Sequence, residues 1–321
     1  MSAHTPLRWL LETDNPSARY LALRDLLHRP ADDEELVAAR SAIVRSAPVR
    51  AILDAQYPAG YWIKPDRGYS PRHKATIWQL IFLSDLGATR SDAIALACEH
   101  VLANALRADL GLFSAHAHST DLYPCLNGDL LRALGHFGYG DHPTVRAVVE
   151  SLADRILTDG FICARNSAHP QDKATWMPCI WGCVKVLRGL AALPGEPHTP
   201  ATQGAIERGV TTLLSHDLAR DQFPAQAGVR SHWLRPGYPL GYGSDLLEAL
   251  LALVELGVAE CPESALQAIH RKRDEAGRWP LEHALRNTWA DFGAPGEPNK
   301  WVTLRALQVL EGSKSPQGRS R

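Results

Sequence analysis

The sequence predicts an all-α protein, an α/α toroid in which six inner helices are wrapped by an outer helical layer. Apolar residues recur at i, i+3, i+4 and i+7 along most of the chain, whereas period-2 alternation rich in Val, Ile and Thr is missing. A tight turn followed by an aromatic residue also returns at intervals of about 50 to 60 residues, which indicates a repeat architecture. Finally, nearly continuous apolar helices alternate with amphipathic ones.

The repeated turn separates successive units of the chain. After each turn comes an irregular stretch rich in Tyr, Trp, His and Arg, and then a strongly apolar helix begins. The copies of the turn are AGYW (59–62), LGLF (110–113), DGF (159–161), DQFP (221–224) and AGRWP (276–280).

The apolar helices are expected to form the inner ring, because a helix that is apolar on nearly every side is buried on every side. In chain order they are residues 17–28, 75–87, 121–138, 174–193, 238–257 and 300–312.

The amphipathic helices are expected to form the outer layer, since they place charges on one face and Ala, Leu, Val or Ile on the other. They are residues 33–47, 91–106, 142–157, 202–218 and 262–272. A stacked open solenoid is the alternative arrangement of such units. We expect one toroid domain over residues 1–312, followed by a disordered tail at 313–321.

The turn motifs carry a family resemblance. The final unit, residues 274–307, and the stretch QYPAGYW at 56–62 resemble the prenyltransferase and squalene-cyclase repeat superfamily, whose members are α/α toroids. The resemblance implies a terpene-cyclase-like enzyme, a lyase or isomerase. The chain lacks the Asp-x-Asp-Asp motif of the cyclases, since its only acidic run, at 31–35, begins an outer helix. It also lacks the zinc pattern of the protein prenyltransferases, to which Asp121 and Cys125 come nearest.

Composition excludes other classes of function. The net charge is -1, and no block of Lys and Arg suggests a nucleic-acid partner. Neither a signal peptide nor a window of about 18 apolar residues is present, which predicts a cytoplasmic protein without an integral membrane segment. The six cysteines form no Cys-x-x-Cys pair and are expected to be reduced thiols. Nothing in the sequence indicates the oligomeric state.

The loops before the inner helices are expected to gather at one mouth of the ring, where helix N-termini favour an anion. Cationic and aromatic residues are frequent in these loops, which suits an amphiphile with an anionic head and an apolar body. The predicted substrate-binding residues are Tyr69, Lys74, Trp78, Tyr123, Trp176, Cys183, His232, Trp233, Tyr238, Tyr242, Lys300 and Trp301.

Candidate catalytic residues come from a motif written twice, YPCLNGDLLRAL at 123–134 and MPCIWGCVKVLRGL at 177–190. Cys125 and Cys179 occupy equivalent positions near helix N-termini, which lower the pKa of a thiol. Asp129 and Asp245 lie in apolar helices, where burial raises the pKa of a carboxyl and makes it a general acid. The other interpretation is that cysteine and glycine here are small residues serving close helix packing.

These patterns predict an enzyme that acts on an amphiphilic, isoprenoid-like small molecule by acid/base chemistry: elimination, hydration, isomerisation or cyclisation. Neither a metal nor a cofactor is expected. One alternative is a zinc enzyme, whose ligands come from Cys125, Cys179, Cys183, Asp121, His116 and His118. The other is a non-catalytic carrier of a lipid or peptide.

Overall fold

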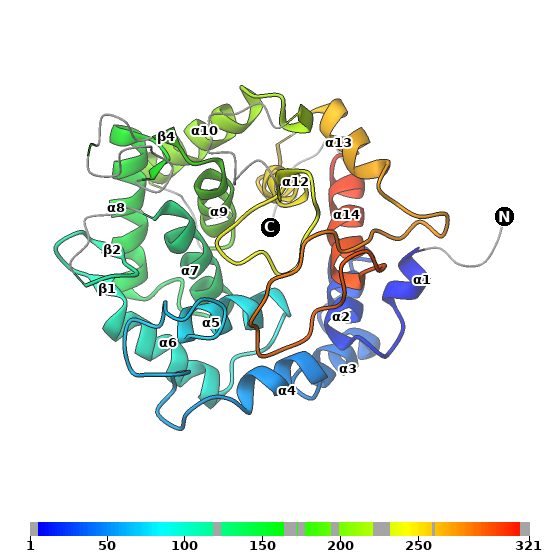
Figure 1. The fold of residues 1–321 in the computed structure, drawn as a ribbon, viewed down its shortest axis with the longest axis horizontal. Helices are drawn as coiled ribbons and strands as arrows, with labels where there is room; N and C mark the ends of the chain where they lie inside the picture. The colour runs from blue at the N-terminus through cyan, green and yellow to red at the C-terminus, as the bar shows by residue number, and fades with distance from the viewer. Residues whose placement is uncertain are drawn as a thin grey trace.

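In the computed structural model the helices form a closed ring, an α/α toroid (Figure 1). The structure describes residues 6–117, 123–163, 172, 177–193, 199–220, 232–258 and 261–314. Among them, no helix is long and apolar enough to cross a membrane.

Within the described residues, six inner helices surround the axis of the ring, as the sequence predicts. They are α2 (Pro16–Asp25), α5 (Thr76–Asp85), α7 (Pro124–His136), α9 (Ile180–Ala191), α12 (Leu246–Glu255) and α14 (Lys300–Gly312). Their buried residues include most of each helix, which is why their sequences are nearly continuously apolar.

The predicted amphipathic helices form the outer layer. They are α3 (Glu34–Ile43), α6 (Asp92–Asn104), α8 (Pro143–Asp159), α10 (Pro200–Leu214) and α13 (Glu263–His270). Each packs its apolar face against an inner neighbour: α3 on α2, α6 on α5, α8 on α7, α10 on α9 and α13 on α12. The remaining short elements are α1 (Pro6–Leu10), α4 (Ala47–Leu53), the 3-10 helix η3 (Leu218–Arg220), and the antiparallel pairs β1–β2 (Leu106–Arg107, Leu112–Phe113) and β3–β4 (Ile162–Cys163, Met177–Pro178).

Two of the repeated turns, AGYW at 59–62 and AGRWP at 276–280, are equivalent in three dimensions. Trp62 is fully buried and donates its indole N–H to a carbonyl ten residues earlier, that of Ile52, at 2.8 Å; Trp279 makes the same bond to Ile269 at 2.8 Å. The backbone N–H of each tryptophan donates to a threonine hydroxyl of the following inner helix, Thr76 in α5 or Thr303 in α14. In these two turns the tryptophan therefore links the preceding helix, α4 or α13, to the next inner helix, α5 or α14.

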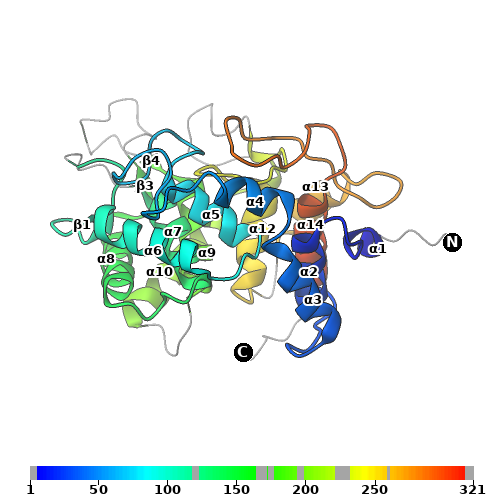
Figure 2. The same cartoon turned by 90° about the horizontal axis from the view of Figure 1, so that it is seen from below.

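The inner helices run parallel, so their N-terminal ends lie on one side of the ring and their C-terminal ends on the other (Figure 2). Helices α7 and α9 pack especially closely, because glycines let their backbones come into contact. A Cβ atom on Gly128 would lie 2.3 Å from the backbone of Lys185, and one on Gly189 would lie 2.5 Å from the carbonyl oxygen of Gly128. The close-packing interpretation of the glycines in the twice-written motif is confirmed.

The last inner helix closes the ring against the first. Gln308 of α14 donates to Asp25 of α2 at 2.7 Å, and Lys300 at the start of α14 pairs with Glu12 at 2.9 Å and with Asp14. These contacts exclude the open solenoid. Of the expected tail at 313–321, residues 315–321 lie outside the described residues.

Candidate functional site

Charged side chains line the axis of the ring below its N-terminal mouth. They lie on inner helices that are otherwise apolar. Where one helix carries two of them, they are three or seven residues apart, and this spacing places them on one face of the helix. The set is Asp85 on α5, Asp129 and Arg132 on α7, Lys185 and Arg188 on α9, Glu248 and Glu255 on α12, and Arg305 on α14.

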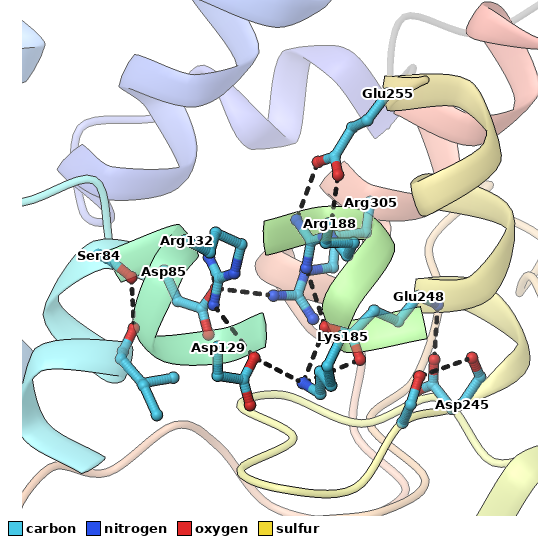
Figure 3. A network of polar contacts seen from close by, with 12 residues as sticks. Ser84, Asp85, Asp129, Arg132, Lys185, Arg188, Asp245, Glu248, Glu255 and Arg305 are labelled. Atoms are coloured by element: carbon cyan, nitrogen blue, oxygen red, sulfur yellow. Dashed lines mark hydrogen bonds and ion pairs between the residues drawn. The ribbon is translucent and has the colours of Figure 1, made fainter. Parts of the chain in front are cut away.

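These side chains form one network, which is buried except for the partly exposed side chain of Glu255 (Figure 3). Arg132 and Arg305 both pair with Asp85, at 2.8 and 3.2 Å. Lys185 lies between Asp129, at 3.3 Å, and Glu248, at 3.0 Å. The four cations and four carboxylates named above balance, which is what allows so many charges to be buried.

Arg188 joins the network to its outer end. Its guanidinium donates to Glu248 at 2.9 Å and forms two 2.9 Å bonds with Glu255. Every nitrogen of this guanidinium therefore has an acceptor, in the bidentate geometry that arginine forms with carboxylates.

Asp129 has a different environment from the other acids. Its side chain is 1% exposed, and neither carboxylate oxygen accepts a hydrogen bond from a described residue. Its contacts are the ion pair with Lys185 and a longer one, 4.0 Å, with Arg132. Burial raises the pKa of Asp129 to about 6, although Lys185 and Arg132 oppose the shift.

The pKa values of Asp85 and Glu248 are lowered, in contrast to that of Asp129. Burial acts to raise the pKa of each carboxyl, but the neighbouring cations outweigh it: Arg132 and Arg305 lower the pKa of Asp85, and Lys185 and Arg188 lower that of Glu248. Asp85 and Asp129 both contact Arg132, yet their pKa values are pushed apart.

A cavity of about 430 Å³ lies at the C-terminal ends of the inner helices, opposite the mouth that the sequence favours. Much of its wall is polar or charged. The lining residues include Arg24, Asp25, Asp85, Arg132, His136, Arg188, Tyr238, Glu255, Trp301, Arg305 and Gln308.

Aromatic side chains cluster on the N-terminal side of the ring. Trp78 packs against Tyr69 and Tyr242, with ring centroids 5.2 and 6.3 Å apart, and Tyr238 stacks on Trp301 at 5.0 Å. A second cavity, of about 360 Å³, lies beside this cluster. Its lining is Tyr238, Ala284, Leu285, Thr288, Trp289, Ala290, Asp291, Phe292 and Gly293, so that Tyr238 borders both cavities.

Asp245 is the N-cap of α12. Its two carboxylate oxygens accept backbone N–H groups, from Glu248 at 2.7 Å and from Gly237 at 2.8 Å. Burial nevertheless raises the pKa of Asp245 to about 7. Asp129 instead pairs with Lys185 and Arg132, so among the described residues the two acids that the sequence pairs have no contact partner in common.

The cysteines of the twice-written motif come together, but as neutral thiols. Cys125 and Cys179 are buried near Cys163 of β3, and the Cys179 sulfur accepts the N–H of Gly182 at 3.4 Å. Burial raises the pKa of Cys125 to about 12, and a hydrogen bond with Cys163, with burial, raises that of Cys179. The expectation of a lowered thiol pKa at these helix N-termini is therefore wrong, because desolvation at Cys125, and the hydrogen bond with Cys163 together with desolvation at Cys179, exceed the effect of the helix dipole.

Several predicted substrate-binding residues have bonding partners within the fold. Lys300 is occupied by Glu12 and Asp14, and the indole N–H of Trp233 donates to the carbonyl of Leu218 at 2.9 Å. The thiol of Cys183 faces the outer layer, where it donates to the carbonyl of Gly209 at 3.4 Å. Burial raises the pKa of Cys183 as well.

Other predicted binding residues lie in aromatic contacts on the N-terminal side. Tyr123 stacks on Tyr69 at 6.4 Å, the Lys74 ammonium lies 4.3 Å from the ring centre of Trp289, and His232 lies 4.3 Å from the ring of His283. Trp176 lies outside the described residues.

The sequence interpretation missed most of the axial network. A signal was present, because acids and bases at spacings of three, four and seven residues stand in helices otherwise too apolar to face solvent. Asp129, Arg132 and His136 follow this spacing on α7, and Lys185 and Arg188 follow it on α9.

A zinc site receives no support from the described part of the chain, where no three His, Cys, Asp or Glu side chains are grouped to hold a metal ion. Cys125, Cys179 and Cys183 do not form one ligand set, since Cys183 faces α10. Asp121 and His118 lie outside the described residues.

Comparison with known proteins finds a structural likeness and no match in sequence. No protein-family model matches the sequence, and no curated protein matches it either. One solved structure to which it is similar is the crystal structure of an unsaturated glucuronyl hydrolase specific for heparin, at 12% identity and a TM-score of 0.47, over 96% of this chain and 86% of that one. What this chain shares with the prenyltransferase and squalene-cyclase proteins is the α/α toroid, and no match supports terpenoid chemistry.

Proposed function

We propose that this protein is an enzyme that performs acid/base chemistry on a polar small molecule in the cavity at the C-terminal ends of the inner helices. The observation that carries the proposal is the pair Asp85 and Asp129. Both contact Arg132, but Asp85 is held ionised while the pKa of Asp129 is raised to about 6. Two carboxyls whose pKa values are pushed apart by their surroundings are suited to act as base and acid.

The two acids are placed for different roles. Asp85 lines the cavity and is the general base, because its ionised form is stabilised by Arg132 and Arg305. Asp129 lies behind Arg132, one helical turn toward the mouth, and is the proton donor and store, since its two oxygens accept no hydrogen bond from a described residue. Asp85 thus takes the part that the sequence interpretation gave to Asp245, whose oxygens are engaged in capping α12.

The walls of the cavity favour a polar substrate over an isoprenoid one. An apolar body in this space would leave Arg132, Arg305 and Asp85 desolvated without new partners, which is costly for charged groups. A molecule rich in hydroxyl or other hydrogen-bonding groups matches the wall. We therefore revise the substrate class while keeping the acid/base chemistry.

The test compares turnover by two variants. Wild type, Asp129→Asn and Asp25→Asn are incubated with a mixture of polar metabolites, and consumption is followed by NMR. Asp25 is the matched control, because it lines the same cavity but is paired with Arg24. We expect Asp129→Asn to slow turnover about 100-fold or more, the usual contribution of a general acid, and Asp25→Asn to leave it within a few-fold.

Folding of each variant is checked by circular dichroism. Equal turnover by wild type and a folded Asp129→Asn protein would remove Asp129 from the chemistry. Consumption that is abolished only by chelators would favour the metal-dependent alternative.

A second candidate function keeps the amphiphile of the sequence interpretation. It is favoured by the second cavity, whose lining includes Leu285, Trp289 and Phe292, with the Lys74 ammonium beside Trp289. An apolar body in this cavity and an anionic head near Lys74 would suit a carrier or an enzyme. Trp289→Ala is expected to weaken binding of a fluorescent fatty acid at least several-fold, whereas Trp9→Ala, on the outside of the ring, is not.

A further inference from the structure

Side chains that line the larger cavity carry hydrogen-bond donors without acceptors. Among the described residues, these are Nε and Nη2 of Arg132, Nη1 of Arg305, the hydroxyl of Tyr238 and the indole N–H of Trp301. All four residues are at least nine-tenths buried. Buried donors without acceptors are rare in folded proteins and require an explanation.

The unpartnered groups are nearly all donors. Guanidinium and indole N–H groups cannot accept hydrogen bonds, and burial raises the pKa of Tyr238, which keeps its hydroxyl neutral and able to donate. The complement of such a set is a ligand group that only accepts, which means an oxyanion. Each such bond involves a charge and is stronger than a neutral one.

The net charge of the cavity wall indicates how many negative charges the bound oxyanion carries. Four arginines line the cavity, against three carboxylates, Asp25, Asp85 and Glu255. The Lys185–Glu248 pair behind them is neutral, so the wall of the cavity carries one net positive charge, and Asp129, which does not line the cavity, lies behind Arg132. His136 adds none, because burial lowers its pKa and its Nε2 is bonded to the carbonyl of Ala88.

We propose that Arg132, Arg305, Tyr238 and Trp301 form a subsite that binds the carboxylate of a singly charged small molecule in the larger cavity. A carboxylate carries one negative charge and two acceptor oxygens, whereas a sulfate or a phosphate dianion exceeds the charge of the wall. The inference rests on the proposed function only in naming the substrate class of the same cavity. It identifies the part of the substrate that is held while Asp85 and Asp129 act on another part.

The neighbouring arginines show why these two are singled out. Every guanidinium nitrogen of Arg188 donates to Glu248 or Glu255, and Arg24 forms bonds of 2.5 and 2.9 Å with Asp25. Both line the cavity, yet their side chains are committed to carboxylates of the fold. Arg132 and Arg305 share the carboxylate of Asp85, and Arg132 has in addition only the longer, 4.0 Å contact with Asp129 among the described residues.

The experiment measures binding of benzoate to the full chain by calorimetry, with benzamide as a neutral ligand of the same shape and sulfate as a dianion. We expect saturable binding of benzoate, at least tenfold tighter than that of benzamide or sulfate. Arg305→Gln is expected to weaken benzoate binding about ten- to a hundredfold, and Tyr238→Phe, which keeps the ring, two- to tenfold. Arg24→Gln is the matched control and is expected to change it less than twofold.

Several results would overturn the proposal: no saturable benzoate binding by the folded wild type, equal binding of benzamide, tighter binding of sulfate, or unchanged benzoate affinity in Tyr238→Phe. The last variant keeps the test decisive if Arg305→Gln fails to fold. Benzoate binding that persists in Asp129→Asn supports the subsite whether or not that variant turns over substrate. If the wild type shows no benzoate binding but its turnover still depends on Asp129, the subsite is wrong and the proposed function is retained.

Discussion

Gly128→Ala tests the closest contact in the ring, that between α7 and α9. An added Cβ would lie 2.3 Å from both the carbonyl carbon and the oxygen of Lys185, whereas ordinary contacts lie at 3.4–4 Å. These atoms are helical backbone and cannot turn aside, so the two helices must move apart by roughly 1 Å. Overpacking of this kind costs about 1–3 kcal/mol or more, and alanine returns about 0.5–1 kcal/mol of helix propensity.

We therefore expect Gly128→Ala to lower the free energy of unfolding by about 2 kcal/mol. The assay is urea denaturation followed by circular dichroism and tryptophan fluorescence. Gly204→Ala in the outer helix α10 is the control, because its Cβ would meet only the flexible side chain of Leu157, at 3.2 Å. The control is expected to be neutral or stabilising. A Gly128→Ala protein within 0.5 kcal/mol of wild type would refute the close backbone contact.

Three further predictions concern buried polar groups. Asp245→Ala removes the cap of α12 and leaves buried N–H groups unpaired, so thermal denaturation should show a loss of about 2 kcal/mol; an unchanged melting temperature would contradict the capping role. The folded pKa of Asp129 is raised to about 6, above the unfolded value, so the folded state binds the proton more tightly and this group makes stability fall as pH rises from about 4 to 6. Asp129→Asn should remove that part of the pH dependence, about 3 kcal/mol, and urea titrations with parallel pH profiles for both proteins would rule it out. Iodoacetamide at pH 8 should label half-buried Cys261 before Cys125 and Cys179, as read by peptide mass spectrometry, whereas early labelling of Cys125 would show an accessible thiolate.

The architecture could be predicted from sequence because burial leaves a direct record in residue type. Helix α5 is apolar on nearly every side and is inner, while α8 alternates charged and apolar faces and is outer. The turn before α14 could also be predicted, because the sequence shows a glycine followed by a tryptophan. In the structure Gly277 adopts a positive φ of 77°, and buried Trp279 donates to the carbonyl of Ile269.

The site could be predicted only in part, because a single carboxylate in an apolar helix does not say what it contacts. Asp129 and Asp245 look alike in sequence, but one caps its own helix and the other faces the axis. Partners such as Asp85 and Arg305 are separated by 220 residues, and local periodicity carries no information about that pairing. The prediction of lowered thiol pKa values was wrong for a similar reason, because the desolvation of a thiol depends on neighbours from other helices.

The closure of the ring by α14 has a consequence for the order in which the molecule acquires its function. Arg305, Gln308 and Lys300 each reach a partner at least 220 residues earlier in the chain. The entropic cost of closing such long loops is offset only by the contacts that form when the last inner helix docks. Folding is therefore expected to be slow at this step. A chain that still lacks α14 therefore has most of its helices but no enclosed cavity. Binding of a ligand in the cavity is expected only after α14 has docked.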